Sequence, residues 1–553
     1  MTRYAFVIDQ RKCIGCHACT VACKAEHDVP IGVNRTWVKY IEKGEFPNSR
    51  RYFLVNRCNH CEDAPCVTIC PTKALFKRAD GIVDFDSERC IGCKSCMQAC
   101  PYDALYIHPD THTAAKCNYC AHRTERGLEP ACVVVCPERA IIAGDMDNPQ
   151  TEIAHLIARE PVRVRKPEQG TKPKVFYIGA EEAIINPEAA SQELPHMTMW
   201  GTLLKTGADE AIFDGGESLR APLTGRDKPP GAINRPLRPY APTEIEAGTA
   251  AGGRVVYEPP TNSTKWGSKV SAYLWTKSIG AGTLIVAALA LALYGLNGIN
   301  PSMNALLGIG APVIGGAFIA ATLVLLIVDL KRPDRFLYLV TKANPTSWLV
   351  WGGVILAIFA LLQAAWFIVA LIGLPGVLLG LLIPTGLFGL AAAGYTAFLF
   401  GQAEGRDFWQ SQLLLPILIV QAALAGAAAL GLLSWALGAI STISAFLTIT
   451  LLIAVVVHTL LVMIEAFGAH ANSHVAAAAR YMSRGGLREL FWGPFFAIGS
   501  IIPIILLCCA LIFPSAQPAL LGFAGIFALI GLFIYEYCFC LLYTSDAADD
   551  LTR

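Results

Sequence analysis

The spacing of the cysteines restricts how this chain can fold more than any other feature does. Twenty cysteines occur in 553 residues, and sixteen of them lie between residues 13 and 136 in four groups of four. The first and third groups have the spacing C-x2-C-x2-C-x3-C, which suits a [4Fe–4S] cube, and the other two fit insertions into that pattern. The groups are Cys13, Cys16, Cys19 and Cys23; Cys58, Cys61, Cys66 and Cys70; Cys90, Cys93, Cys96 and Cys100; and Cys117, Cys120, Cys132 and Cys136.

Two alternatives to iron–sulfur clusters fit this spacing less well. C-x2-C runs are too short to close useful disulfide loops. Zinc sites normally use two C-x2-C pairs with a longer spacer and no third cysteine at the next step. Proline follows the fourth cysteine of three groups, as Pro71, Pro101 and Pro137, although Lys24 follows that of the first group. This proline is typical of bacterial ferredoxins with two clusters, so the sequence predicts iron–sulfur ligation.

Short apolar strands at residues 4–9 and 81–86 precede the first and third groups, which predicts the strand–loop–helix rhythm of a ferredoxin repeat. With these motifs, residues 1–190 resemble the four-cluster iron–sulfur subunits of the dimethyl sulfoxide reductase and polysulfide reductase families. The resemblance implies four [4Fe–4S] clusters whose ligands are exchanged between groups. The implied sets are Cys13, Cys16, Cys19 and Cys136; Cys23, Cys117, Cys120 and Cys132; Cys58, Cys61, Cys66 and Cys100; and Cys70, Cys90, Cys93 and Cys96.

Composition divides the chain after this region. Residues 191–270 contain stretches such as "APLTGRDKPPGAINRPLRPYAPTE", so we predict a linker rich in Pro and Gly. The net charge is +1 and no Lys/Arg block stands out, which argues against a nucleic-acid partner. We expect no export signal, because "MTRYAFVIDQRKC" reaches its first cysteine without an apolar run.

Residues 271–539 are predicted to form an eight-helix transmembrane bundle. Each of eight apolar stretches reaches the roughly 20 residues that a helix needs to cross a bilayer. We therefore predict α+β ferredoxin-like repeats followed by an all-α membrane domain, in a multi-pass protein of the prokaryotic cytoplasmic (inner) membrane. The stretches are 274–296, 309–330, 347–371, 376–400, 413–436, 441–466, 491–513 and 517–537.

Basic residues are unequally distributed among the connections between these stretches. The connections after the second, fourth and sixth stretches contain Lys and Arg, and those after the first, third, fifth and seventh contain neither. With an even number of spans, the basic connections lie on the same side as the cysteine-rich domain. The positive-inside rule therefore predicts that this domain lies on the cytoplasmic face.

One connection, "DLKRPDRFLYLVTKANPTSW" at residues 329–348, carries a second resemblance. It resembles the polysulfide reductase membrane subunit (NrfD-like) family, whose pattern runs D-L-G-R-P-E-R-F and then N-P-x-S; Lys331 and Asp334 depart from it. The resemblance extends over residues 270–539. It implies a bundle that binds quinone (menaquinone or ubiquinone) beside the nearest cluster and contains no haem. The two families together imply a molybdopterin-containing catalytic partner. They also leave open an alternative to the cytoplasmic face, because in several relatives the iron–sulfur subunit lies outside the cytoplasm, and the loop arginines would then be functional and not topological.

The last residues carry no such pattern. "CLLYTSDAADD", at residues 540–550, resembles the translation of a transposon-type sequencing adapter and follows an apolar helix abruptly. We interpret residues 540–553 as an adapter-derived artefact, and a short polar tail is the alternative.

Ionisable residues inside a span are functional candidates. Lys277 lies near the start of the first span, where a cation could donate to a quinone carbonyl or extend to the interface as an ordinary snorkelling lysine. From the motif we add Arg332 and Arg335, which could act on quinone, order their loop or bind lipid headgroups. We predict that the quinone contacts are Trp275, Lys277, Asp329 and Arg332.

His458 and Glu465 are seven residues apart and therefore share one face of the sixth span. They could relay protons to the quinone or form a buried pair with a neighbouring helix. His470 and His474 follow at helical spacing, but a bis-histidine haem needs ligands from facing helices, so no haem is expected.

The sequence thus favours a membrane-bound electron-transfer subunit that connects quinone, through four clusters, with a catalytic partner. One alternative is a self-sufficient ferredoxin:quinone oxidoreductase that needs only a soluble donor. Another is a membrane scaffold whose clusters are structural. Direction of electron flow is not encoded in these motifs.

Overall fold

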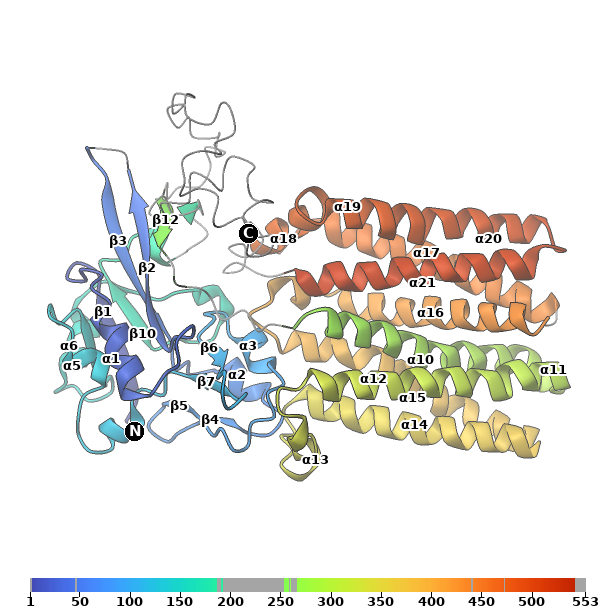
Figure 1. The fold of residues 1–553 in the computed structure, drawn as a ribbon, viewed down its shortest axis with the longest axis horizontal. Helices are drawn as coiled ribbons and strands as arrows, with labels where there is room; N and C mark the ends of the chain where they lie inside the picture. Colours follow the sequence, from blue (N-terminus) through green and yellow to red (C-terminus); the bar gives the residue numbers. More distant parts are fainter. Residues whose placement is uncertain are drawn as a thin grey trace, which may run out of the picture.

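The computed structural model describes residues 2–44, 47–185, 190–191, 253–257, 259, 266–438, 441–471 and 473–542. Figure 1 shows an α+β domain at one end of the molecule and a bundle of long helices that extends away from it. The predicted fold class is confirmed, because strands and short helices carry the cysteines and long apolar helices follow.

The cysteine-rich domain is built on a four-stranded sheet with the order β8-β1-β10-β9. β1, the strand predicted at residues 4–9, pairs antiparallel with β8 and parallel with β10. Its residues 5–8 are at most 1% exposed, which explains why this strand is a continuous apolar run. The strands are β1 (Tyr4–Asp9), β8 (Ile141–Asp145), β9 (Val162–Arg163) and β10 (Val175–Ile178), and helix α6 (Glu152–Arg159) packs on β1 and β8.

A second sheet has the order β11-β12-β2-β3 and includes part of the predicted linker. β12 pairs with β2, so at least these residues of the segment 191–270 belong to the cysteine-rich domain. The remainder of that segment lies mostly outside the described residues. The strands are β2 (Thr36–Lys43), β3 (Arg50–Arg57), β11 (Ala190–Ser191) and β12 (Gly253–Tyr257).

Short hairpins and helices flank the cysteine loops. The strand predicted at residues 81–86 is β5, which pairs with β4, and β6 pairs with β7. The hairpin strands are β4 (Leu75–Lys77), β5 (Val83–Phe85), β6 (Leu105–Ile107) and β7 (Ala114–Lys116). The helices are α1 (Ala18–Glu26), α2 (Pro65–Thr68), α3 (Ser95–Ala99), α4 (Ala121–Thr124) and α5 (Ala131–Val134).

Among the described residues, eight helices are long and apolar enough to cross a membrane, as predicted. The first and fifth are 78% and 72% buried in their most apolar windows, whereas the other six are between 28% and 44% buried. The first and fifth therefore form the centre of the bundle. The spans are α10 (Ser268–Tyr294), Pro301–Asp329 (mostly α12, Ala311–Asp329), α14 (Trp348–Ile372), α15 (Pro375–Gly401), α16 (Leu414–Ala436), Ile443–Phe467 (in α17, Ser441–Phe467), Arg488–Ile512 (ending in α20, Ile502–Ile512) and α21 (Gln517–Leu541).

The two central helices cross at glycines. α10 packs on α12 and α15, α16 packs on α17 and α21, and α10 and α16 pack on each other. At their crossing a methyl group on Gly282 would overlap the Ala422 carbonyl, and one on Gly426 would overlap Gly282. Small residues of this kind let membrane helices approach closely.

The basic connections lie at the end of the bundle that meets the cysteine-rich domain. The second-to-third connection bonds to the third cysteine loop through Lys331 N–H and the Gly92 carbonyl, 3.2 Å apart. The fourth-to-fifth connection reaches α3 through Arg406 Nε and Gln98 Oε1, 2.8 Å apart. In the sixth-to-seventh connection, α18 (Ser473–Arg484) packs on η7 (Asp407–Gln410). The predicted common side for these connections is therefore observed.

Candidate functional site

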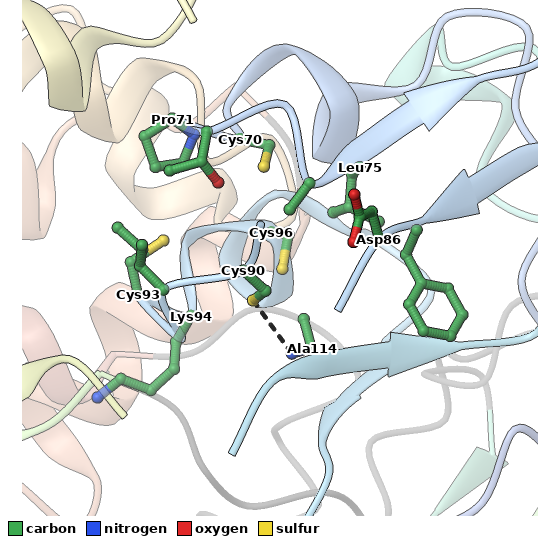
Figure 2. A pocket seen from close by; sticks show the side chains of 13 residues that line it. Cys70, Pro71, Leu75, Asp86, Cys90, Cys93, Lys94, Cys96 and Ala114 are labelled. Atoms are coloured by element: carbon green, nitrogen blue, oxygen red, sulfur yellow. Dashed lines mark hydrogen bonds between the residues drawn. The ribbon is translucent and has the colours of Figure 1, made fainter. Parts of the chain in front are cut away.

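Cysteines distant in sequence converge around two closely similar cavities. The cavity in Figure 2 is lined by Cys70 from the second group and by Cys90, Cys93 and Cys96 from the third. The other is lined by Cys13, Cys16, Cys19 and Cys136. Each cavity is lined by four cysteines, three from one group and one from another, which suits the same group in each. Both sets are the ones that the family resemblance implies.

The remaining eight cysteines lie close to one another, in an arrangement compatible with the implied sets. Cys66 lies within electrostatic range of Cys58, Cys61 and Cys100, and Cys23 within range of Cys120 and Cys132. Cys117 lies near Cys23 and Cys132, and also near Cys58 of the neighbouring set. α1 explains the exchange between groups: it carries both Cys19 and Cys23, one turn apart, and each joins a different set.

The loops that carry the first and third groups have the same backbone. Gly15 and Gly92, two residues after the first cysteine, have φ of 69° and 67°, and His17 and Lys94, two residues further on, have φ of 60° and 63°. Left-handed residues turn peptide N–H groups inward, where the Gly92 amide lies 3.4 Å from Cys90 Sγ. Such N–H donors stabilise thiolate sulfur and tune a cluster.

The donor set fits an iron–sulfur cube better than a single ion. Among the described residues, no three His, Cys, Asp or Glu side chains are placed to hold one metal ion. Burial raises the pKa of the Cys23 and Cys61 thiols to about 12. Thiolates in such surroundings need direct bonds to a metal, because water does not solvate them.

A buried cation also fits a negatively charged group. Arg57, 2% exposed, donates from Nη1 to Cys132 Sγ at 3.2 Å, and its Nε and Nη2 have no hydrogen-bond partner among the described residues. Burial alone would lower the pKa of Arg57, but the cysteines around the guanidinium outweigh burial and raise that pKa. An arginine in this position is compensated if the cysteine set carries a cluster.

Side chains of the membrane domain form hydrogen bonds with the loops that carry the cysteine set shown in Figure 2. Asp329 accepts a hydrogen bond from Lys94 Nζ at 2.8 Å, beside the cavity. Three other side chains donate to main-chain carbonyls of cysteines in this set: Trp266 to Cys93 at 2.9 Å, Arg335 to Cys90 at 3.1 Å and Asn344 to Cys70 at 2.8 Å. This set is therefore bound directly to the membrane domain through the main chain of its cysteines.

The predicted quinone residues of the motif lie in this interface. Arg332 bonds to Asp334 and to the Thr111 carbonyl, and Arg335 bonds to carbonyls of the third cysteine loop and of Ser87. Asp329 likewise contacts the cysteine-rich domain. These contacts favour the loop-ordering alternative for the two arginines.

Lys277, in contrast, is enclosed in the bundle. It is 0% exposed, and its ammonium donates to the Ala393 carbonyl at 2.9 Å and to Thr396 Oγ1 at 2.6 Å. It also lies 5.1 Å from the centre of the Tyr395 ring. A lysine buried in this way does not reach an interface, so the snorkelling alternative is wrong. Lys277 lies about 14 Å along α10 from Ser268, at 1.5 Å per residue.

Glu536 on α21 was not among the sequence candidates. It is 1% exposed, its Oε1 has no hydrogen-bond partner among the described residues, and it is the acidic group whose charge acts on Lys277. The sequence does contain an indication of its importance, because Glu536 is an ionisable residue inside a predicted membrane span.

His458 and Glu465 meet through another residue of α21. Tyr535 donates from its hydroxyl to Glu465 Oε2 at 3.0 Å, and its ring lies 5.1 Å from that of His458. Gln421 Nε2 lies 3.3 Å from His458 Nε2. The predicted shared face of the sixth span is observed, and it is completed by α16 and α21.

Trp275 lies apart from Lys277. Its indole donates to the Leu529 carbonyl at 2.9 Å and packs against Phe318 and Phe533. The structure thus places it between α12 and α21, whereas Lys277 contacts α15.

Comparison with known proteins agrees with this arrangement. Residues 258–547, more than half of the sequence, match the family described as polysulphide reductase, NrfD. Residues 12–75 and 49–146 match 4Fe–4S dicluster domains.

Three relatives show what the cysteine-rich part is similar to. One subunit of tetrathionate reductase from Salmonella typhimurium is 47% identical over 189 residues, 34% of this chain and 76% of that protein. Protein NrfC of Escherichia coli is 44% identical over 179 residues, 32% of this chain and 80% of that protein. The arsenate respiratory reductase iron-sulfur subunit of a Shewanella species is 34% identical over 226 residues, 32% of this chain and 96% of that protein.

Proposed function

Because this protein belongs to the polysulphide reductase NrfD family and also carries 4Fe–4S dicluster domains, we propose that it conducts electrons between membrane quinone and a catalytic partner protein. The four cysteine sets hold four [4Fe–4S] clusters, which supply one-electron transfer when bound. The observation that carries the proposal is the position of the cysteine sets. One set lies against the membrane domain, and α1, which carries Cys19 of another set, lies in the part of the α+β domain that faces away from the bundle (Figure 1).

The quinone end of the proposal rests on Lys277 and its neighbours. A quinone carbonyl accepts hydrogen bonds, and its reduction consumes protons. The Lys277 ammonium donates the hydrogen bond, and Glu536, whose charge acts on that ammonium, exchanges the proton. Glu465, Tyr535 and His458 form the polar continuation of this site in the second half of the bundle.

The partner end rests on an apolar surface beside the first cavity. Ile14 and Cys16 line that cavity and are exposed, and Val21 and Val134 are 64% and 57% exposed on α1 and α5, which pack together. Apolar patches of this kind are typical of protein interfaces. Two of the relatives are named as subunits of reductases, which supports a separate catalytic subunit; the families resembled make it a molybdopterin enzyme.

The test is an anaerobic redox titration of the full protein in detergent, followed by low-temperature EPR before and after addition of a short-chain quinol. Four [4Fe–4S] signals, at least one of which is reduced by quinol or oxidised by quinone, are expected. Four clusters that are neither reduced by quinol nor oxidised by quinone would indicate a structural scaffold. Turnover with a soluble ferredoxin, without any catalytic subunit, would favour the ferredoxin:quinone oxidoreductase.

A further inference from the structure

We infer that the loop at residues 329–348 positions and tunes the membrane-facing cluster, and that Arg335 and Asn344 are its positioning residues. This inference rests on the proposed function only in requiring a cluster at Cys70, Cys90, Cys93 and Cys96. It gives the motif shared with the membrane-subunit family a role at the metal centre instead of at the quinone.

The first support is the choice of contact atoms. Arg335 Nη1 donates to the carbonyls of Ser87 and Cys90, at 2.7 and 3.1 Å. Asn344 donates from Nδ2 to the Cys70 carbonyl and from its main-chain N–H to the Pro71 carbonyl, both at 2.8 Å. The loop therefore holds the main chain on both sides of the cavity, because Cys70 and Cys90 come from different groups.

Close packing is the second support. Gly92, between Cys90 and Cys93, lies against Lys331, and a methyl group at Gly92 would come within 2.6 Å of the Lys331 Cβ and 2.8 Å of the His112 carbonyl. The main-chain amides of Lys331 and Arg332 donate to the carbonyls of Gly92 and Ile91, both at 3.2 Å. These contacts keep the cysteine loop from shifting toward the membrane domain.

Charge is the third support. Two of the cations beside this set have close acidic partners: Lys94 with Asp329 and Arg332 with Asp334, both at 2.8 Å. Arg335 reaches Asp334 only at 3.9 Å and directs its donors at carbonyls instead. A positive charge near a cluster stabilises the reduced form, which carries one more negative charge. Arg335 should therefore raise the reduction potential of this cluster.

The decisive variant is Arg335→Gln, measured by EPR redox titration of the whole protein. At a fixed ambient potential, we expect the reduced-to-oxidised ratio of one cluster to fall about tenfold, equivalent to about 59 mV for one electron. The cluster is identified as the one whose signal Cys93→Ser alters. The other three should be unchanged, and Arg335→Lys, which keeps the charge, should return most of the shift.

Control variants distinguish an effect on the reduction potential of the cluster from an effect on the contact between the two domains. Lys342→Gln removes a charge from the same loop, where Lys342 lies over the Tyr338 ring, and should leave all four potentials unchanged. Asn344→Leu should shift the same cluster, whereas Thr341→Val, which loses only a bond to the Leu337 carbonyl within the loop, should not.

Each failure has its own meaning. If the wild-type protein shows four clusters, one of which exchanges electrons with quinone, and Arg335→Gln changes no potential, only this inference is overturned. It is also overturned if Arg335→Lys shifts the cluster as far as Arg335→Gln does. If the wild-type clusters do not exchange electrons with quinone, the proposed function is wrong. The reduction potentials of the variants still decide whether the loop tunes a cluster.

Discussion

At the scale of single residues, a buried arginine without a carboxylate is stable only if another group supplies negative charge. Arg57 is such a residue among the described part of the protein, and Cys132 is its hydrogen-bond partner. Arg57→Leu should leave the cluster uncompensated and destabilise this region by roughly 3 kcal/mol or more. Iron content per protein and EPR check this. Arg51→Leu is the matched control, because Arg51 lies on the same strand but pairs at the surface with Glu42; equal iron loss in both variants would contradict the argument.

Lys277 makes a second prediction at this scale. Lys277→Met should slow reduction of the clusters by quinol by at least roughly tenfold, because the hydrogen-bond donor and its proton are lost. Stopped-flow absorbance of the clusters measures this rate. Lys269→Met, on the same helix but with an exposed side chain, should react like the wild type. An unchanged rate in Lys277→Met would remove this lysine from the quinone site.

The charge relation between Lys277 and Glu536 gives a third prediction. Both side chains are buried, so each single neutral variant leaves one buried ionisable group in the bundle, whereas Lys277→Met with Glu536→Gln removes both. The double variant should therefore be more stable than the sum of the single losses, by roughly 1 kcal/mol or more. Thermal unfolding in detergent measures the cycle, and simple additivity would show that the charges do not interact.

At the scale of elements, the central crossing of the bundle rests on glycines. Gly426→Ala should force α16 away from α10 and cost roughly 1–3 kcal/mol, because its methyl group would overlap Gly282. Gly386→Ala, on α15, is the control, since nothing lies within 4 Å of its added methyl group. Melting temperature and detergent-resistant yield check the difference. Equal stability of the two variants would mean that the helices do not cross at this point.

The same scale shows what the sequence could predict. Cysteine spacing and apolar length are local properties, so they predict the iron–sulfur loops and the eight spans without knowledge of the fold. The partners of Arg335 and Asn344 depend on the docking of two domains, which local patterns do not contain. Glu536 is an intermediate case. Its place inside an apolar span can be read from the sequence, but its proximity to Lys277 depends on the packing of α21 beside α10.

At the scale of the whole molecule, the basic connections and the cysteine-rich domain share one end of the bundle. By the positive-inside rule, we propose that this end faces the cytoplasm. A protease site inserted after Gly373, in the exposed connection between α14 and α15, should be cut by protease added to intact spheroplasts. A site inserted after Lys342, in the connection that contacts the cysteine-rich domain, should be cut only after lysis.

The orientation decides where the electrons are delivered. If the site after Gly373 is protected and the one after Lys342 is cut from outside, the cysteine-rich domain and its partner lie on the outer face. The basic residues of the second-to-third connection would then serve to bind and tune the clusters, as inferred for Arg335, and would not determine how the protein inserts into the membrane. Cleavage at Gly373 from outside would instead show that the same charges serve both purposes, since they lie on the cytoplasmic side and against the cluster loop at once.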